Sequence, residues 1–137
     1  MNNPQPINHS TIQPACKRPN YSDMKIIYNR LLPFRGFTAI NLMGIVFARA
    51  EYRPLSAAVL RHEAIHTAQM RETGYVGFYL IYIVEWLWEL LRLRDTLAAY
   101  RAIRFEREAY RHMVDPDYLA RRRPFAWTRP EIQTTNH

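Results

Sequence analysis

Cysteine is almost missing from this chain of 137 residues, since Cys16 is the only one. A single cysteine excludes an intramolecular disulfide framework and every zinc module that is built on several thiolates. Any metal ion would therefore have to be held by histidine and carboxylate side chains, the other common ligands in proteins. The sequence contains 5 histidines and 12 acidic residues that could serve.

The chain also lacks a long hydrophobic run. Its most apolar stretch, YVGFYLIYIV at 75–84, is followed by Glu85 and Glu89, and it falls short of the roughly 20 apolar residues that span a bilayer. The first residues are polar and do not resemble a signal peptide. We therefore expect a cytoplasmic protein in which 76–93 is a buried core helix, with a membrane-surface helix as the less favoured alternative. Glu85 and Glu89 would form a narrow solvated stripe on it.

Positive charge exceeds negative charge, which gives a net charge of +7. Such an excess can indicate binding to nucleic acid or to an acidic membrane. The arginines are scattered, however, and only Arg121, Arg122 and Arg123 form a run. This distribution favours a solvated cationic surface, so we expect no nucleic-acid partner. A nucleic-acid-binding module that uses RRRPFAW at 121–127 is kept as the weakest alternative.

Composition divides the chain into three parts. Residues 1–23 are rich in Asn, Pro and Ser and show no periodicity, which predicts a disordered N-terminal extension. Residues 24–127 carry the periodic apolar segments and predict a single domain, as the length of the chain also suggests. Residues 128–137 are predicted to be a flexible tail.

Within the domain, two segments are predicted to be strands. A short strand is expected at 24–29. The β-branched and aromatic residues of 38–49 predict a second strand, in which Gly44 indicates a bulge or a close backbone approach.

Three segments with helical periodicity follow the strands. Ser56 is a candidate N-cap and Gly74 a candidate stop for the first helix. Further helices are expected at 76–93 and 96–113. The fold class predicted from these elements is α+β, with a small antiparallel sheet packed on about three helices.

The pattern that carries chemistry is HEAIH. Its histidines, His62 and His66, are four residues apart, so they lie nearly above one another on a helix and can bind one ion. Glu63 points about 100° around the helix, from where it can serve as a general base without being a ligand. Both histidines fall on the apolar face with residues such as Ile65, where unpartnered imidazoles would be costly. The alternative is a pair of core histidines that are hydrogen-bonded to neighbouring groups.

A catalytic zinc site requires a third protein ligand. Glu72 stands where a longer form of this motif has its last histidine, but it falls on the charged face of the helix. Glu106 is the better candidate, because it lies at the centre of the apolar face of the helix at 96–113. A buried carboxylate needs a cation or several hydrogen-bond donors. Glu108 lies on the opposite side among arginines, where a solvated ion pair is expected.

These residues predict a Zn²⁺ ion bound by His62, His66 and Glu106. For Glu106 the alternative is a buried salt bridge to an arginine of another element. His112, at the border of the apolar face, is a weaker ligand candidate.

HEAIH followed by FEREAY on a later helix resembles the gluzincin class of zinc metallopeptidases, in which HExxH on one helix is joined by a glutamate ligand from a second. The likeness is closest to the CAAX-prenyl-protease-like branch, whose later helix reads Glu-x-x-Ala-Asp. Here Tyr110 replaces the aspartate, although its hydroxyl could still support a ligand. The stretches MKIIYN, INLMGIVFAR, HEAIHTAQMRE, FEREAY and RRPFAW also resemble a family of small bacterial proteins, which implies a compact zincin-like domain over 24–127.

The resemblance implies that zinc is held by these three ligands and that Glu63 activates water for attack on a carbonyl. It also implies that the strand at 38–49 pairs with an extended substrate, so a peptide or protein substrate is expected. Tyr110, Tyr75 and His112 are the candidates for stabilising the oxyanion. The expected function is that of a zinc metallopeptidase. The alternative is a zincin-like binding or regulatory protein without turnover.

Overall fold

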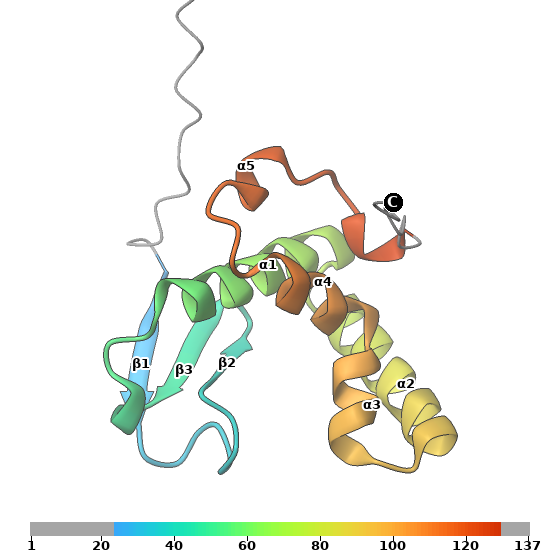
Figure 1. The fold of residues 1–137 in the computed structure, drawn as a ribbon, viewed down its shortest axis with the longest axis horizontal. Helices are drawn as coiled ribbons and strands as arrows, with labels where there is room; N and C mark the ends of the chain where they lie inside the picture. The colour runs from blue at the N-terminus through green and yellow to red at the C-terminus, as the bar shows by residue number, and fades with distance from the viewer. Residues whose placement is uncertain (1–23, 130–137) are drawn as a thin grey trace, which may run out of the picture.

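The computed structural model describes residues 24–129, which form a sheet of three strands and a set of helices (Figure 1). The predicted extension at 1–23 and residues 130–137 of the predicted tail lie outside this part. The α+β class is confirmed. The elements are β1 (Ile26–Asn29), β2 (Ala39–Leu42), β3 (Ile45–Arg49), η2 (Ala50–Tyr52), α1 (Ala57–Thr73), α2 (Val76–Leu93), α3 (Thr96–Ala102), α4 (Arg104–His112), α5 (Tyr118–Arg121) and η3 (Ala126–Thr128).

The segment at 38–49 forms a hairpin and not the single strand that was predicted. Met43 and Gly44 both have a positive φ, of 55° and 85°, which is the backbone of a tight two-residue turn between β2 and β3. The turn is held from outside, because the Met43 N–H donates to the Tyr79 hydroxyl at 2.8 Å. The glycine that suggested a bulge therefore reverses the chain.

Because of this reversal, the sheet is mixed and not the wholly antiparallel sheet that was predicted. β3 lies in the centre, antiparallel to β2 and parallel to β1. Because the chain turns back between β2 and β3, the central strand runs in the direction of β1. β2 is left at an edge of the sheet.

The helix that carries HEAIH begins and ends as predicted. Ser56 caps α1 by accepting a hydrogen bond from the Val59 N–H at 3.3 Å, and Gly74 ends the helix with a φ of 71°. α1 lies across the molecule, with the sheet under its N-terminal half and α2 under its C-terminal end (Figure 1).

The predicted helix at 96–113 is broken into α3 and α4. Ile103 takes an extended ψ of 132° between them, and the two helices meet at a bend (Figure 1). Ile103 is fully buried, so the break is held by packing. Glu85 stabilises the new N-terminus, because its carboxylate accepts a hydrogen bond from the Arg104 N–H at 3.0 Å. Glu85 is therefore a capping side chain that also pairs with Arg104, whereas a solvated role was predicted.

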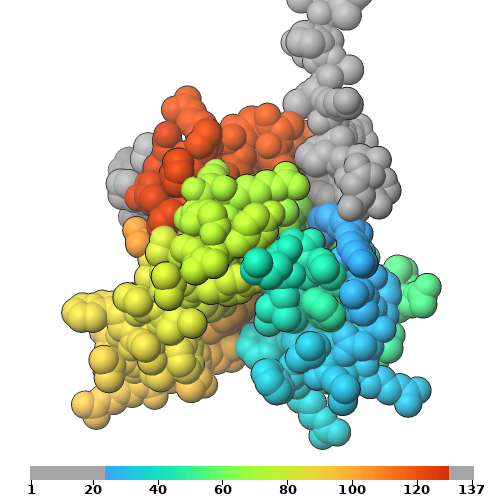
Figure 2. Space-filling view, turned by 180° about the vertical axis from the view of Figure 1, so that it is seen from behind, coloured from blue at the N-terminus to red at the C-terminus, as the bar shows by residue number. Residues whose placement is uncertain are grey.

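α2 spans the predicted residues, but it is not the buried core helix that was expected. Phe78 is its one buried side chain, and an apolar side of the helix faces solvent. In the space-filling view α2 and α3 form a lobe that projects from the body (Figure 2). No helix within residues 24–129 combines the length and the apolar character needed to cross a bilayer.

The largest apolar cluster joins α2, α4 and the C-terminal segment. Phe105 is fully buried, and its ring lies 4.5 Å from the Phe78 ring and 4.5 Å from the Trp127 ring between centroids. This cluster fixes α4 beside α1 and sets the position of the residue that follows Phe105.

Replacing Phe105 by alanine should lower the free energy of unfolding by about 3–5 kcal/mol, because it removes a ring from a fully packed site. Urea unfolding of the metal-free protein followed by circular dichroism would measure this. The matched Leu31→Ala variant, at a side chain that is 84% exposed, should change the value by less than about 0.5 kcal/mol. Equal effects of the two substitutions would contradict the assigned core.

Candidate metal centre

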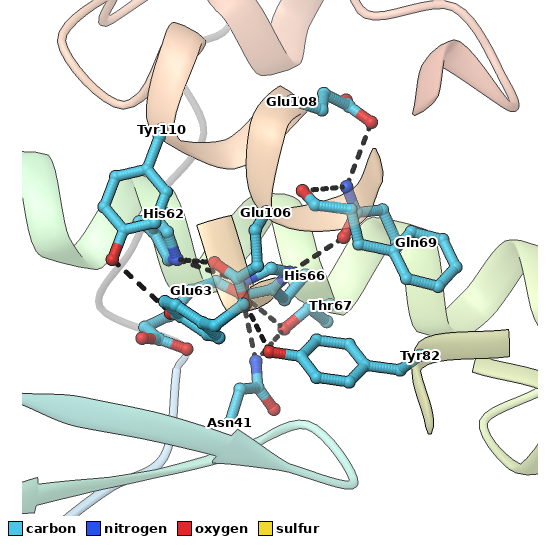
Figure 3. Close-up of polar contacts among 12 residues, drawn as sticks. Asn41, His62, Glu63, His66, Thr67, Gln69, Tyr82, Glu106, Glu108 and Tyr110 are labelled. Carbon is cyan, nitrogen blue, oxygen red and sulfur yellow. Dashed lines mark hydrogen bonds and ion pairs between the residues drawn. The ribbon is translucent and has the colours of Figure 1, made fainter. Parts of the chain in front are cut away.

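The three predicted ligands meet in the interior. α1 supplies His62 and His66 on one face, and α4 supplies Glu106 from across the helix interface (Figure 3). All three are buried, and each offers one ligand atom within 4.8 Å of the others. The group could therefore hold a metal ion.

The distances between the ligand atoms fit a single ion. Nε2 of His62 and Nε2 of His66 are 3.0 Å apart, and each lies 3.2 Å from an oxygen of Glu106. In a tetrahedral site with bonds of about 2.0–2.1 Å, ligand atoms are about 3.3 Å apart. The same contacts exclude the predicted alternative for Glu106, because its partners are the two imidazoles and not an arginine.

Electrostatics keep the central carboxylate ionised. Burial alone would raise the pKa of the Glu106 carboxyl, but His66 and His62 beside it hold that pKa well below its usual range. Burial would likewise lower the pKa of His66, and the Glu106 carboxylate overcomes this and raises it to about 9. The buried anion thus requires a cation next to it, which is either the proton on His66 or a metal ion.

Gln69 orients His66 and was missed as part of the site. Its amide Nε2 donates to the Phe105 carbonyl at 3.1 Å and to the Glu108 carboxylate at 3.0 Å. Its Oε1 must then be the atom that faces Nδ1 of His66 at 2.8 Å. Nδ1 therefore donates, and Nε2 is presented toward His62 and Glu106. A second hydrogen bond of this kind fixes the ring of a metal-binding histidine and raises its basicity.

Glu108 is buried, so its predicted role in a solvated ion pair is wrong. Besides Gln69, its carboxylate accepts hydrogen bonds from the Tyr118 hydroxyl at 2.8 Å and from Arg122 at 3.1 Å. Arg122 also pairs with Glu72 on α1. The segment after α4 folds back over the side of the helix that lies opposite Glu106. A helical wheel treats that side as solvent, which is why the prediction failed.

Glu63 lies in the pocket beside the three ligands. Burial raises the pKa of its carboxyl to about 7, and the charge of His66 limits the rise. Its Oε2 is buried and has no hydrogen-bond partner within 24–129. Its backbone carbonyl is held by the Asn41 side chain of β2 at 2.9 Å. This hydrogen bond fixes the backbone at Glu63, and the unpaired Oε2 is available to accept a proton.

A cavity of about 340 Å³ opens next to the ligands, and most of its lining is apolar or aromatic. All four residues of the edge strand β2 border it. Among the described residues that line it there is no lysine or arginine. The side chains that form its walls are Pro33, Phe34, Phe37, Ala39, Ile40, Leu42, Met70, Phe78, Tyr79, Tyr82 and Tyr100.

Of the three residues predicted to support the centre, Tyr110 lies beside a ligand, whereas His112 and Tyr75 lie elsewhere. The Tyr110 ring packs edge-on against His62, with 4.6 Å between centroids, and its hydroxyl lies 3.4 Å from that of Tyr100. His112 instead stacks on Tyr118 at 3.7 Å and lines a different pocket. Tyr75 lies near the β2–β3 turn and does not border the cavity.

Three tyrosines of the cavity wall, Tyr79, Tyr82 and Tyr100, were not predicted, and two of them interact with Glu106. The Tyr82 hydroxyl donates to Oε1 of Glu106 at 2.9 Å. Burial and the Glu106 carboxylate raise the pKa of Tyr82 and of Tyr100 far above the usual range, so both phenols stay protonated. A buried carboxylate needs a hydrogen-bond donor. This need could have indicated Tyr82, which carries a hydroxyl group on the inner side of an apolar helix.

Comparisons with protein-family models, curated proteins and solved structures find no match to this chain. The chemistry of the centre therefore rests on its own residues.

A Gln69→Leu variant should bind Zn²⁺ or Co²⁺ about 10–100-fold more weakly, because His66 loses the acceptor that orients it. A titration against a competing chelator would measure the affinity, with circular dichroism to verify folding. Thr73→Val is the matched control, since it removes a hydrogen bond to the Gln69 carbonyl one turn further along α1. Unchanged affinity in Gln69→Leu would show that the hydrogen bond does not support the centre.

Proposed function

We propose that this protein is a zinc-dependent hydrolase that cleaves peptide bonds. The observation that carries the proposal is the Glu63 carboxylate, whose buried Oε2 has no hydrogen-bond partner among residues 24–129, beside a converging set of two imidazoles and one carboxylate. Such a set suits zinc and leaves one coordination position open. It also suits iron(II); we propose zinc because two histidines four apart on a helix, with a glutamate base directly after the first, are the pattern of zinc hydrolases.

The number of ligands supports a catalytic role over a structural one. A closed structural zinc site has four protein ligands. Within 24–129, three side chains form the group, and the cavity opens beside them. The alternative of a zinc-binding protein without turnover would call for a fourth protein ligand at this centre.

Zinc, when bound, would acidify a water molecule and polarise the substrate carbonyl. Glu63 accepts the proton of the attacking water as the new C–O bond forms. It then gives this proton to the amine nitrogen as the C–N bond breaks. Tyr100 lines the cavity, and its protonated hydroxyl is our candidate donor to the carbonyl oxygen, ahead of Tyr110.

The walls of the cavity favour one kind of substrate. Their aromatic and aliphatic side chains, together with the absence of lysine and arginine among the described residues that form them, suit a large uncharged side chain next to the cleaved bond. The edge strand β2 can pair with the substrate backbone. We therefore propose a peptide substrate with a bulky apolar residue.

A Glu63→Gln variant should retain stoichiometric zinc and lose hydrolysis by at least about 100-fold, because the amide cannot accept the proton. Metal analysis and a quenched fluorescent peptide library would measure the two properties. Glu106→Ala should lose zinc and activity together. Glu51→Gln, at a surface ion pair with Arg49, is the matched control and should change neither. Full activity of Glu63→Gln would contradict the role of the base.

The pocket preference can be tested with hydroxamates, which bind zinc directly. One that carries a benzyl group should bind the zinc-loaded protein at least about tenfold more tightly than acetohydroxamate, because burial of the ring adds about 1.5–3 kcal/mol. The gain should shrink in Phe34→Ala, which alters the cavity wall, and persist in Leu31→Ala on the same loop. Equal binding of both compounds would contradict the pocket assignment, and binding of neither would contradict the zinc centre.

A further inference from the structure

One side of α2 is apolar and uncovered, in the lobe that projects from the body (Figure 2). Six large side chains on it are each between 48% and 78% exposed. This apolar stripe consists of Leu80, Ile83, Val84, Leu87, Trp88 and Leu91.

The stripe contains no charge. Between 76 and 91 the charged residues are Glu85 and Glu89, and at 100° per residue they point away from the stripe. Glu85 pairs with Arg104 and Glu89 pairs with Arg92. The side of α2 that faces the cavity, with Phe78 and Tyr82, is also distinct from the stripe. The metal centre does not require these exposed apolar side chains.

Exposure of this much contiguous apolar surface is unusual for a protein that acts as a monomer. The six side chains present on the order of 700 Å², close to the roughly 800 Å² that each partner buries in a stable interface. The remaining sequence, at 1–23 and 130–137, contains no apolar run that would match the stripe.

We infer that the stripe is the contact between two copies of this chain. Its spacing, with Leu80, Ile83 and Leu87 three and four residues apart, is that of helices that pack side by side. Without charge, the stripe can meet its own copy without placing like charges together. A lipid surface fits less well, because no lysine or arginine lies between 76 and 91 and Arg92, at the end of the stripe, pairs with Glu89.

The two copies of α2 run antiparallel. Arg92 and Arg94 follow the stripe at one end of the helix. A parallel pair would bring these cations close to those of the second copy, whereas an antiparallel pair separates them by the length of the stripe. The cavity lies on the other side of α2, so a dimer contact at the stripe does not cover it. The contact also holds in place the helix that carries Tyr82.

Sedimentation velocity over a range of concentrations tests the dimer. The wild type should show twice the 16.4 kDa mass of one chain. Leu80→Glu and Leu87→Glu should weaken self-association at least about 100-fold, because an unpaired carboxylate is costly to bury. Val114→Glu, at a side chain that is also highly exposed but outside the stripe, should remain dimeric. A monomeric wild type would overturn the inference, whether or not it binds vesicles with an acidic lipid.

Cross-linking tests the orientation in a Cys16→Ser background. An antiparallel pair brings position 80 of one copy close to position 91 of the other. The double variant Leu80→Cys/Leu91→Cys should therefore form covalent dimers on mild oxidation, while either single variant should not. Covalent dimers of the single variants would overturn the antiparallel arrangement. Neither experiment depends on zinc or on catalysis, so the outcome is separate from that of the proposed function.

Discussion

The buried carboxylate of Glu106 is the constraint on which the rest of this structure depends. An ionised carboxylate in the interior costs several kcal/mol unless charge and hydrogen bonds compensate it. Here the compensation comes from two imidazoles of α1 and from the Tyr82 hydroxyl of α2. One side chain of α4 therefore fixes the positions of α1, α2 and α4 relative to one another. A small apolar core would not specify these positions by itself.

A second set of buried polar side chains, centred on Gln69 and Glu108, supports the metal ligands. Gln69 links His66 to Glu108, and Glu108 is held by Tyr118 and Arg122 from the segment after α4. Each donor in this chain of contacts faces an acceptor, which is the condition under which a buried network gives rigidity. The C-terminal segment thus contributes to the orientation of a histidine without touching it.

The sequence predicted those features that depend on helical periodicity alone. His62, His66 and Glu106 were found because each lies on the inner face of its own helix. Periodicity could not reveal the hairpin turn at Gly44 or the break at Ile103, because both are stabilised by distant partners, Tyr79 and Glu85. Glu108 was misplaced for a related reason: a wheel divides a helix into one buried and one solvated side, whereas α4 is covered on both.

α2 shows how one helix can meet two separate demands. Its inner side supplies Phe78 to the core and Tyr82 to the carboxylate, and each of these positions is specified by its partners. Its outer side has no such partners within residues 24–129, and yet it is as apolar as a core. The share of apolar residues in a helix does not distinguish these two cases, since an apolar helix can be buried by its own chain or by a second one. The distinction lies in the placement of charge, because the carboxylates of α2 lie on the side away from the stripe, where Glu85 pairs with Arg104, and none lies within the stripe.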